Sequence, residues 1–147
     1  MTRYYDTGIL LKLYTEEEGS ERVRLWVVRR REALVFTALH RAECVSALRL
    51  KVFRGECRAE QSDAALAHLD EDAAAGVLRR TALDWDAAWE RAGILSGAAA
   101  AETGCRTLDA LHVACALQLG AREIVTRDSR QAALARKAGL KATNPLK

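Results

Sequence analysis

Short β-prone runs alternate with long helical patterns along this chain of 147 residues, and that alternation constrains the fold more than any other feature. Strands are predicted over residues 3–5, 33–36, 77–81, 124–126 and 141–143. Apolar residues at intervals of three to four predict helices over residues 20–31, 39–54, 58–74, 84–102, 108–119 and 129–137. Short strands separated by helices are typical of a parallel sheet covered on both faces. We therefore expect an α/β fold, a three-layer α/β/α domain around a central parallel sheet of four to five strands.

Length and composition favour a single globular domain over residues 1–147. A chain of this length corresponds to one domain at the usual domain size. Half of its residues are hydrophobic, which is enough to build a core without disulfide bonds and argues against a disordered chain. The sequence contains one Pro and nine Gly and no linker-like tract. The four cysteines lack zinc-finger or redox-motif spacing, which predicts free thiols in a reducing cytosol.

Charge patterning leaves the class of partner open. The 23 Lys and Arg against 20 Asp and Glu give a net charge of +3, too small a surplus to require nucleic acid. Of the 23 cations 18 are Arg, whose planar guanidinium suits phosphate contacts. The sequence has no apolar run of the roughly 18 residues that would span a bilayer. We expect a soluble cytoplasmic protein that does not bind membranes.

Four carboxylates occupy positions where an acid needs an explanation. Ligands of open parallel sheets bind beyond the carboxyl ends of the strands, and Asp6 and Asp128 follow predicted strands there. Glu43 is predicted to share a helical stripe with the apolar residues 39, 47 and 50, where an unpaired carboxylate is costly. Asp109 begins a stripe that continues with residues 113, 116 and 117.

Helix capping is the competing interpretation of these acids. Asp128 matches an N-cap with Gln131 three residues later, and Asp6 is suitably placed to cap a helix that begins at Thr7. Asp109 lies in the first turn of a helix that Thr107 would cap, where an acid also interacts favourably with the helix dipole. By contrast, the three consecutive acids at 16–18 are expected to be solvated surface charges.

Convergence of the four acids on one cleft would require a cation. Ionised carboxylates at close range repel one another unless a positive charge neutralises them. Oxygen ligands without His or Cys at ligand spacing point to Mg²⁺ or Mn²⁺ rather than zinc. Ions of this kind bind phosphodiesters and activate water, so hydrolytic phosphoryl transfer is the chemistry implied.

Two other classes stay open at this level. One is another phosphoryl-transfer enzyme on a similar sheet, although Gly8 stands where an aspartyl phosphatase usually has its second Asp, and a receiver domain would have a pair of acids before its first helix. The other is a non-catalytic interaction module in which the acids are caps and surface charges. Metal binding separates these options, because a cluster of helix caps should not need Mg²⁺ for its stability.

Four segments carry a resemblance to a known family. YYDTGILLKLY, TALHRAECVSALR, RTLDALHVACAL and IVTRDSRQAALARKAGL resemble, in order and spacing, the motifs of PIN-domain nucleases, and most of all the VapC-type toxins of type II toxin–antitoxin pairs. The resemblance extends from the first strand almost to the C-terminus. It implies one PIN-like nuclease domain over residues 1–147, with Tyr4 and Tyr5 where the family more often has aliphatic residues.

The resemblance also implies a site and partners. The four family acids fall on Asp6, Glu43, Asp109 and Asp128, with Asp6 and Asp109 as the firmest metal ligands. It implies an endoribonuclease that uses Mg²⁺ or Mn²⁺ to cut RNA such as tRNA or rRNA. It further implies a cognate antitoxin that covers the cleft, and a homodimer.

Four further residues lie close to these motifs. Thr7 and Thr126 are suitably placed to hydrogen-bond a ligand carboxylate or a bound water. His112 lies one helical turn from Asp109, and we favour a structural role for it over a catalytic one. Lys12 is expected to be solvated, with a contact to substrate phosphate as the alternative.

Overall fold

The predicted alternation of strands and helices is confirmed in a computed structural model that describes residues 3–147. In chain order the elements are β1 (Arg3–Tyr5), α1 (Thr7–Leu11), α2 (Ser20–Arg30), β2 (Leu34–Phe36), α3 (Ala38–Phe53), α4 (Ala59–Ala75), β3 (Leu78–Arg80), α5 (Trp85–Thr103), α6 (Thr107–Gln118), β4 (Glu123–Val125), α7 (Ser129–Lys137) and β5 (Lys141–Thr143). Every predicted strand and long helix is present, and the ends differ from the predictions by at most one residue.

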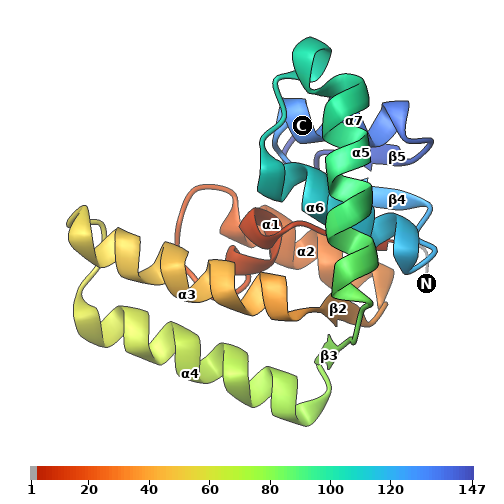
Figure 1. Cartoon of the computed structure of the whole chain (residues 1–147). Coiled ribbons are helices and arrows are strands. Elements are labelled where there is room, and N and C mark those ends of the chain that lie inside the picture. Colours follow the sequence, from red (N-terminus) through yellow and green to blue (C-terminus); the bar gives the residue numbers. More distant parts are fainter. Residues whose placement is uncertain (1–2) are drawn as a thin grey trace. The chain divides into compact units, whose positions relative to one another are not determined.

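The chain divides into two compact units (Figure 1). The terminal unit joins the described residues up to Asp6 with Leu83–Lys147, and the middle unit is Thr7–Ala82. The terminal unit holds a parallel sheet of order β1-β4-β5, and the middle unit holds the parallel pair β2-β3. The parallel α/β class is confirmed, and its five strands are distributed over a sheet of three and a sheet of two.

The core of the terminal unit lies between its sheet and α5, α6 and α7. Tyr4 of β1 pairs with Ile124 of β4, and both side chains are fully buried. Helix α6 packs against β4 and against α5 and α7, and every residue from Ala110 to Ala116 is buried. Gly104, at a left-handed φ of 69°, ends α5 and lets the chain turn into α6. This packing sets the start of α6 and the carboxyl ends of β1 and β4.

In the middle unit α3 and α4 lie side by side (Figure 1). Thr37 caps α3, because its hydroxyl accepts from the His40 backbone N–H while the His40 ring accepts from the Thr37 N–H. The side chains of His40, Cys44 and Leu48 form the buried face of α3. The helix also packs against α1, which immediately follows the terminal unit's first strand in sequence.

Candidate functional site

Asp6 lies at the carboxyl end of β1, where its side chain is 8 % exposed. Its backbone N–H continues the β1–β4 ladder by donating to the Val125 carbonyl at 3.0 Å. The hydroxyl of Thr126, which directly follows β4, donates to Asp6 Oδ2. A buried carboxylate needs such partners because loss of hydration disfavours its charged form. The predicted hydrogen bond from Thr126 to a carboxylate is confirmed.

Asp128 shares Thr126 with Asp6. The Asp128 backbone N–H donates to the Thr126 hydroxyl oxygen at 3.0 Å, and that hydroxyl donates onward to Asp6. Asp128 Oδ1 accepts from the N–H groups of Arg130 at 2.8 Å and Gln131 at 3.2 Å, so the predicted N-cap of α7 is also confirmed. One threonine hydroxyl therefore links the loops that carry two of the four predicted acids.

Asp109 lies in the first turn of α6 and is half-buried. Its Oδ2 accepts from the backbone N–H of Arg106 at 3.1 Å. The prediction that Thr107 caps this helix is wrong: α6 begins at Thr107, and Arg106 occupies the N-cap position. The carboxylate of Asp109 accepts a hydrogen bond from one of the backbone N–H groups that have no partner within the helix.

Glu43 belongs to the middle unit and is half-buried on α3. The Thr7 hydroxyl donates to Glu43 Oε1 at 2.7 Å, which confirms the predicted hydrogen bond from Thr7 to a carboxylate. The predicted apolar stripe around Glu43 is wrong in part, because Leu50 is 43 % exposed. The buried face of α3 is formed by His40, Cys44 and Leu48, so Glu43 lies at the border of this face.

The four acids thus divide three to one between the units, and their chemistry suits a hard cation. Within residues 3–147 no group of three or more His, Cys, Asp or Glu side chains is gathered closely enough to hold a metal ion. The donors are nevertheless all carboxylate oxygens, the ligands that Mg²⁺ and Mn²⁺ prefer. In the described part of the chain, hydrogen bonds to the carboxylates of Asp109 and Asp128 use one oxygen of each, and the other oxygen is left for a ligand.

His112 packs inside the terminal unit and is 3 % exposed. Its Nδ1 lies 2.7 Å from the Tyr4 hydroxyl, and the two rings meet edge to face with centroids 5.7 Å apart. This geometry supports the structural role favoured from the sequence. The ring braces α6, which carries Asp109, against β1, which directly precedes Asp6.

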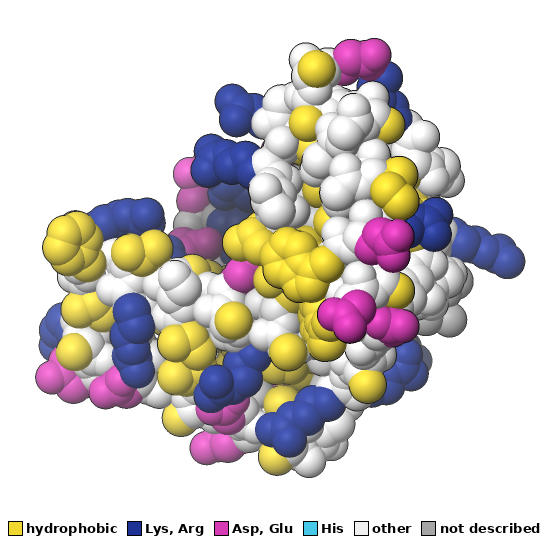
Figure 2. All heavy atoms as spheres, in the orientation of Figure 1, with side chains coloured by type: hydrophobic (Ala, Val, Ile, Leu, Met, Phe, Trp, Pro, Cys, Tyr) yellow, Lys and Arg dark blue, Asp and Glu magenta, His cyan; other side chains and the backbone are white. Residues whose placement is uncertain are grey.

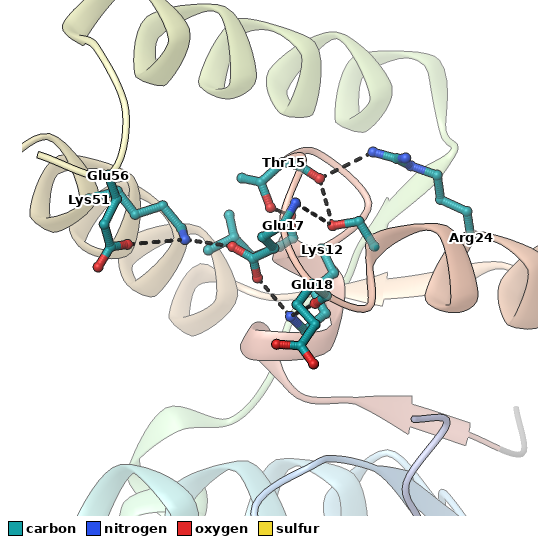
Figure 3. Close-up of polar contacts among 9 residues, drawn as sticks. Lys12, Thr15, Glu17, Glu18, Arg24, Lys51 and Glu56 are labelled. Carbon is teal, nitrogen blue, oxygen red and sulfur yellow. Dashed lines mark hydrogen bonds and ion pairs between the residues drawn. The ribbon is translucent and has the colours of Figure 1, made fainter. Parts of the chain in front are cut away.

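Lys12 and Glu17 form an ion-pair cluster that the sequence did not predict (Figure 3). The expectation of a solvated Lys12 is wrong: its side chain is buried, and Nζ donates to Glu17 Oε1 at 2.8 Å and to the Glu18 carbonyl at 2.7 Å. Lys51 of α3 donates to the other Glu17 oxygen at 2.5 Å. Glu17 is therefore not part of a solvated charge run. No local pattern signals a partner that is 34 positions away.

Two opposing influences, burial and the neighbouring lysines, set the pKa of Glu17. Burial is the largest single influence and opposes ionisation. The hydrogen bonds and positive charges of Lys12 and Lys51 together outweigh it and hold the pKa of Glu17 below its usual range. Glu17 is consequently a carboxylate whose charge is neutralised within the chain.

Comparison with known proteins identifies the family. The sequence profile described as "PIN domain" matches residues 3–137, a range that includes the middle unit, most of the terminal unit and all four acids. The chain belongs to the PIN-domain family. Domains of this family are in general nucleases. A search of curated proteins found no match.

Two solved structures share the fold of this chain. The crystal structure of FitAcB from Neisseria gonorrhoeae aligns with a TM-score of 0.66 at 18 % identity, over 98 % of both chains. The structure of VapBC-1 from nontypeable Haemophilus influenzae aligns with a TM-score of 0.67 at 18 % identity, over the whole of both chains. Within the described residues, no helix combines the length and the apolar character needed to cross a membrane.

Proposed function

We propose that this PIN domain is a metal-dependent endoribonuclease, and that Asp6, Glu43, Asp109 and Asp128 hold Mg²⁺ or Mn²⁺. The observation that carries the proposal is the Thr126 hydroxyl, which bonds the Asp6 carboxylate and the Asp128 backbone at the carboxyl edge of a parallel sheet. Ligands of such sheets bind at this edge. The sequence resemblance assigns the family's acids to the same positions.

The residues of the chain would act mainly by orienting the carboxylates. Thr126 holds Asp6, the first turn of α7 holds Asp128, and the Arg106 N–H holds Asp109. Thr7 holds Glu43 from the middle unit. A divalent cation, when bound, supplies a water of lowered pKa and neutralises charge that develops on the phosphodiester. The protein needs no nucleophile of its own for this chemistry.

The proposed biological role is that of the toxin in a toxin–antitoxin pair. It rests on the VapC-like segments of the sequence and on structural likeness to the VapBC-1 and FitAcB chains. A cognate antitoxin, a homodimer, a cytoplasmic location and a tRNA or rRNA substrate belong to this proposal. Expression of the wild-type chain is then expected to arrest growth, and Asp6→Asn to relieve the arrest. Healthy growth with active protein would instead favour a housekeeping role in RNA processing.

Capping contacts favour one alternative, a non-catalytic interaction module. Asp109 and Asp128 each accept backbone N–H groups at the start of a helix, a role that needs no metal. In that case Mg²⁺ would neither bind nor change the thermal stability of the protein.

Cleavage of total tRNA and rRNA by the purified protein tests the proposal. Reactions contain Mg²⁺, Mn²⁺ or EDTA, and the variants are Asp6→Asn and the control Asp86→Asn, which changes an exposed acid of α5. We expect metal-dependent cutting by the wild type and by Asp86→Asn, and none by Asp6→Asn. Failure of folded, antitoxin-free protein to cut with any metal would overturn the nuclease.

A further inference from the structure

A basic cavity adjoins the carboxyl ends of β4 and β5 in the terminal unit. Its volume is about 340 Å³. Thr126 and Asp128 line it on the β4 side, and Thr143 and Asn144 line it on the β5 side. Thr126 is the residue whose hydroxyl binds Asp6. The cavity therefore shares a wall with the proposed metal site.

We propose that this cavity is a subsite for a backbone phosphate of the RNA strand, next to the phosphodiester that is cut. The proposal rests on the proposed nuclease function and adds to it the part of the substrate that is bound. Three cationic side chains line the cavity, Arg127, Arg136 and Lys147, against the single carboxylate of Asp128. One carboxylate against three cations leaves the lining of the cavity with a net positive charge.

The cations are available to an external anion. Among the described residues, neither Arg127 nor Lys147 forms an ion pair, and both are exposed. Arg136 reaches from the last turn of α7 toward β5, where its guanidinium donates to the Ala142 carbonyl at 3.4 Å. Asn144 orders the turn that precedes Lys147, because its side chain accepts from the Leu146 N–H at 2.9 Å. Two guanidinium groups and a nearby ammonium favour a phosphate with several oxygens to accept hydrogen bonds.

A second cavity of the chain has a different charge pattern, in which acids outnumber the cation that pairs with them. The cavity between α3 and α4, of about 480 Å³, is lined by Glu16, Glu17 and Glu56, with Lys51 paired to two of them. On the face drawn in Figure 2, Lys and Arg are interspersed with Asp and Glu and form no continuous basic surface. Against this background the three cations beside Thr126 are a local concentration of positive charge, and RNA is the ligand it fits.

RNA binding in EDTA tests the subsite without cleavage. The double variant Arg127→Gln with Arg136→Gln is compared with the wild type and with Arg122→Gln, an exposed arginine that precedes β4 at the opposite, amino edge of the sheet. The probe is a fluorescently labelled single-stranded RNA of mixed sequence, titrated at several salt concentrations. We expect the double variant to bind about tenfold more weakly, with a salt slope smaller by about 0.7 for each phosphate that is no longer neutralised, while Arg122→Gln binds as the wild type does.

Two further readouts separate this proposal from the nuclease itself. Mn²⁺ should bind the double variant at least as tightly as the wild type, because no proposed metal ligand has been changed and two nearby positive charges have been removed. The thermal midpoint of the double variant should stay close to that of the wild type. If the double variant binds and cleaves RNA like Arg122→Gln while the wild type is an active nuclease, the subsite is wrong and the proposed function stands. If the wild type neither binds nor cleaves RNA, both fail. If the double variant loses binding to an acidic peptide but still binds RNA, the cavity is a site for a protein partner. This result would overturn the RNA subsite.

Discussion

Glu17 of the middle unit and two candidate ligands of the terminal unit, Asp109 and Asp128, are held in different ways. In the middle unit the Glu17 carboxylate lies between the ammonium groups of Lys12 and Lys51. In the terminal unit Asp109 and Asp128 accept only backbone N–H groups, and within the described chain no Lys or Arg forms an ion pair with either. Both arrangements hold a carboxylate in place, but only the first supplies a full opposite charge.

This difference separates structural acids from candidate ligands. A carboxylate between two lysines has little further attraction for a metal ion, because its charge is already balanced within the chain. Backbone N–H groups orient a carboxylate and leave most of its negative charge for a cation from solution. Burial alone does not separate the two kinds of acid, since Asp6 is more buried than Glu17.

The largest expected effect is on cleavage by Asp109→Asn. Asparagine keeps an oxygen that accepts from the Arg106 N–H, so the start of α6 is retained, while the charge offered to a cation is lost. We expect cleavage to fall by about 100-fold or more, and the free energy of unfolding to change by less than about 1 kcal/mol. Single-turnover cleavage and urea unfolding measure the two effects. If a well-folded Asp109→Asn protein cleaves RNA at the wild-type rate, Asp109 is not part of the site.

Glu17→Gln should show the opposite pattern, with a loss of stability and no direct loss of metal binding. The substitution leaves the buried Lys12 ammonium without its ionic partner. We expect about 2 kcal/mol of destabilisation in urea unfolding and an unchanged Mn²⁺ affinity. Glu18→Gln is the matched control, because Glu18 contacts Lys12 only through its backbone carbonyl. A Glu17→Gln protein that is as stable as Glu18→Gln would show that the cluster contributes nothing to the fold.

The same cluster predicts a pH dependence of stability. Because the folded pKa of Glu17 lies below its unfolded value, the unfolded chain takes up this proton first as the pH falls. The stabilisation is complete above the ordinary Glu pKa of about 4.3 and is lost as the pH falls through the lower folded pKa. The stability difference between wild type and Glu17→Gln should therefore be constant near neutral pH and shrink below about pH 4. A difference that grows on acidification would contradict this assignment.

Local sequence patterns predicted the elements of the fold well. Helix periodicity and strand propensity depend on neighbours within one or two turns, so even the short strands at Arg3–Tyr5 and Lys141–Thr143 were placed correctly. The cap at Asp128 depends on residues two and three positions away and was predicted for the same reason. The division into two sheets depends on strand pairing over long separations, which no local pattern reports.

Predictions about the candidate site failed where burial and side-chain contacts depend on the tertiary structure. Lys12 was expected in solvent because lysine side chains are solvated by default, yet Glu17 and the Glu18 carbonyl contact its ammonium. The apolar stripe expected around Glu43 does not coincide with the buried face of α3. An apolar residue such as Leu50 can lie on the surface with little loss of stability. Thr126 was anticipated as a partner of a carboxylate, but its simultaneous contact with Asp6 and the Asp128 backbone needed the structure.

Thr126→Val should have a moderate effect on metal affinity. It removes the hydroxyl that donates to Asp6 and accepts from the Asp128 N–H. Groups that orient metal ligands are typically worth 10- to 100-fold in affinity, so we expect Mn²⁺ binding, measured by calorimetry, to weaken by about tenfold. Thr143→Val is the matched control, because its hydroxyl also donates to a carboxylate, that of Glu123, which pairs with Arg3 outside the proposed site. Equal Mn²⁺ affinity in both variants would mean that Thr126 does not position a ligand.

The smallest expected effect is that of Tyr4→Phe, and it tests whether His112 belongs with the structural residues or with the site. The change removes the hydroxyl that lies 2.7 Å from His112 Nδ1 and keeps the edge-to-face packing of the rings. A buried hydrogen bond of this kind contributes about 1 kcal/mol to stability, which urea unfolding resolves. The pH profile of cleavage should be unchanged, because the proposed role of His112 is to brace α6 against β1. A shifted pH profile would place His112 in the reaction and overturn its purely structural role.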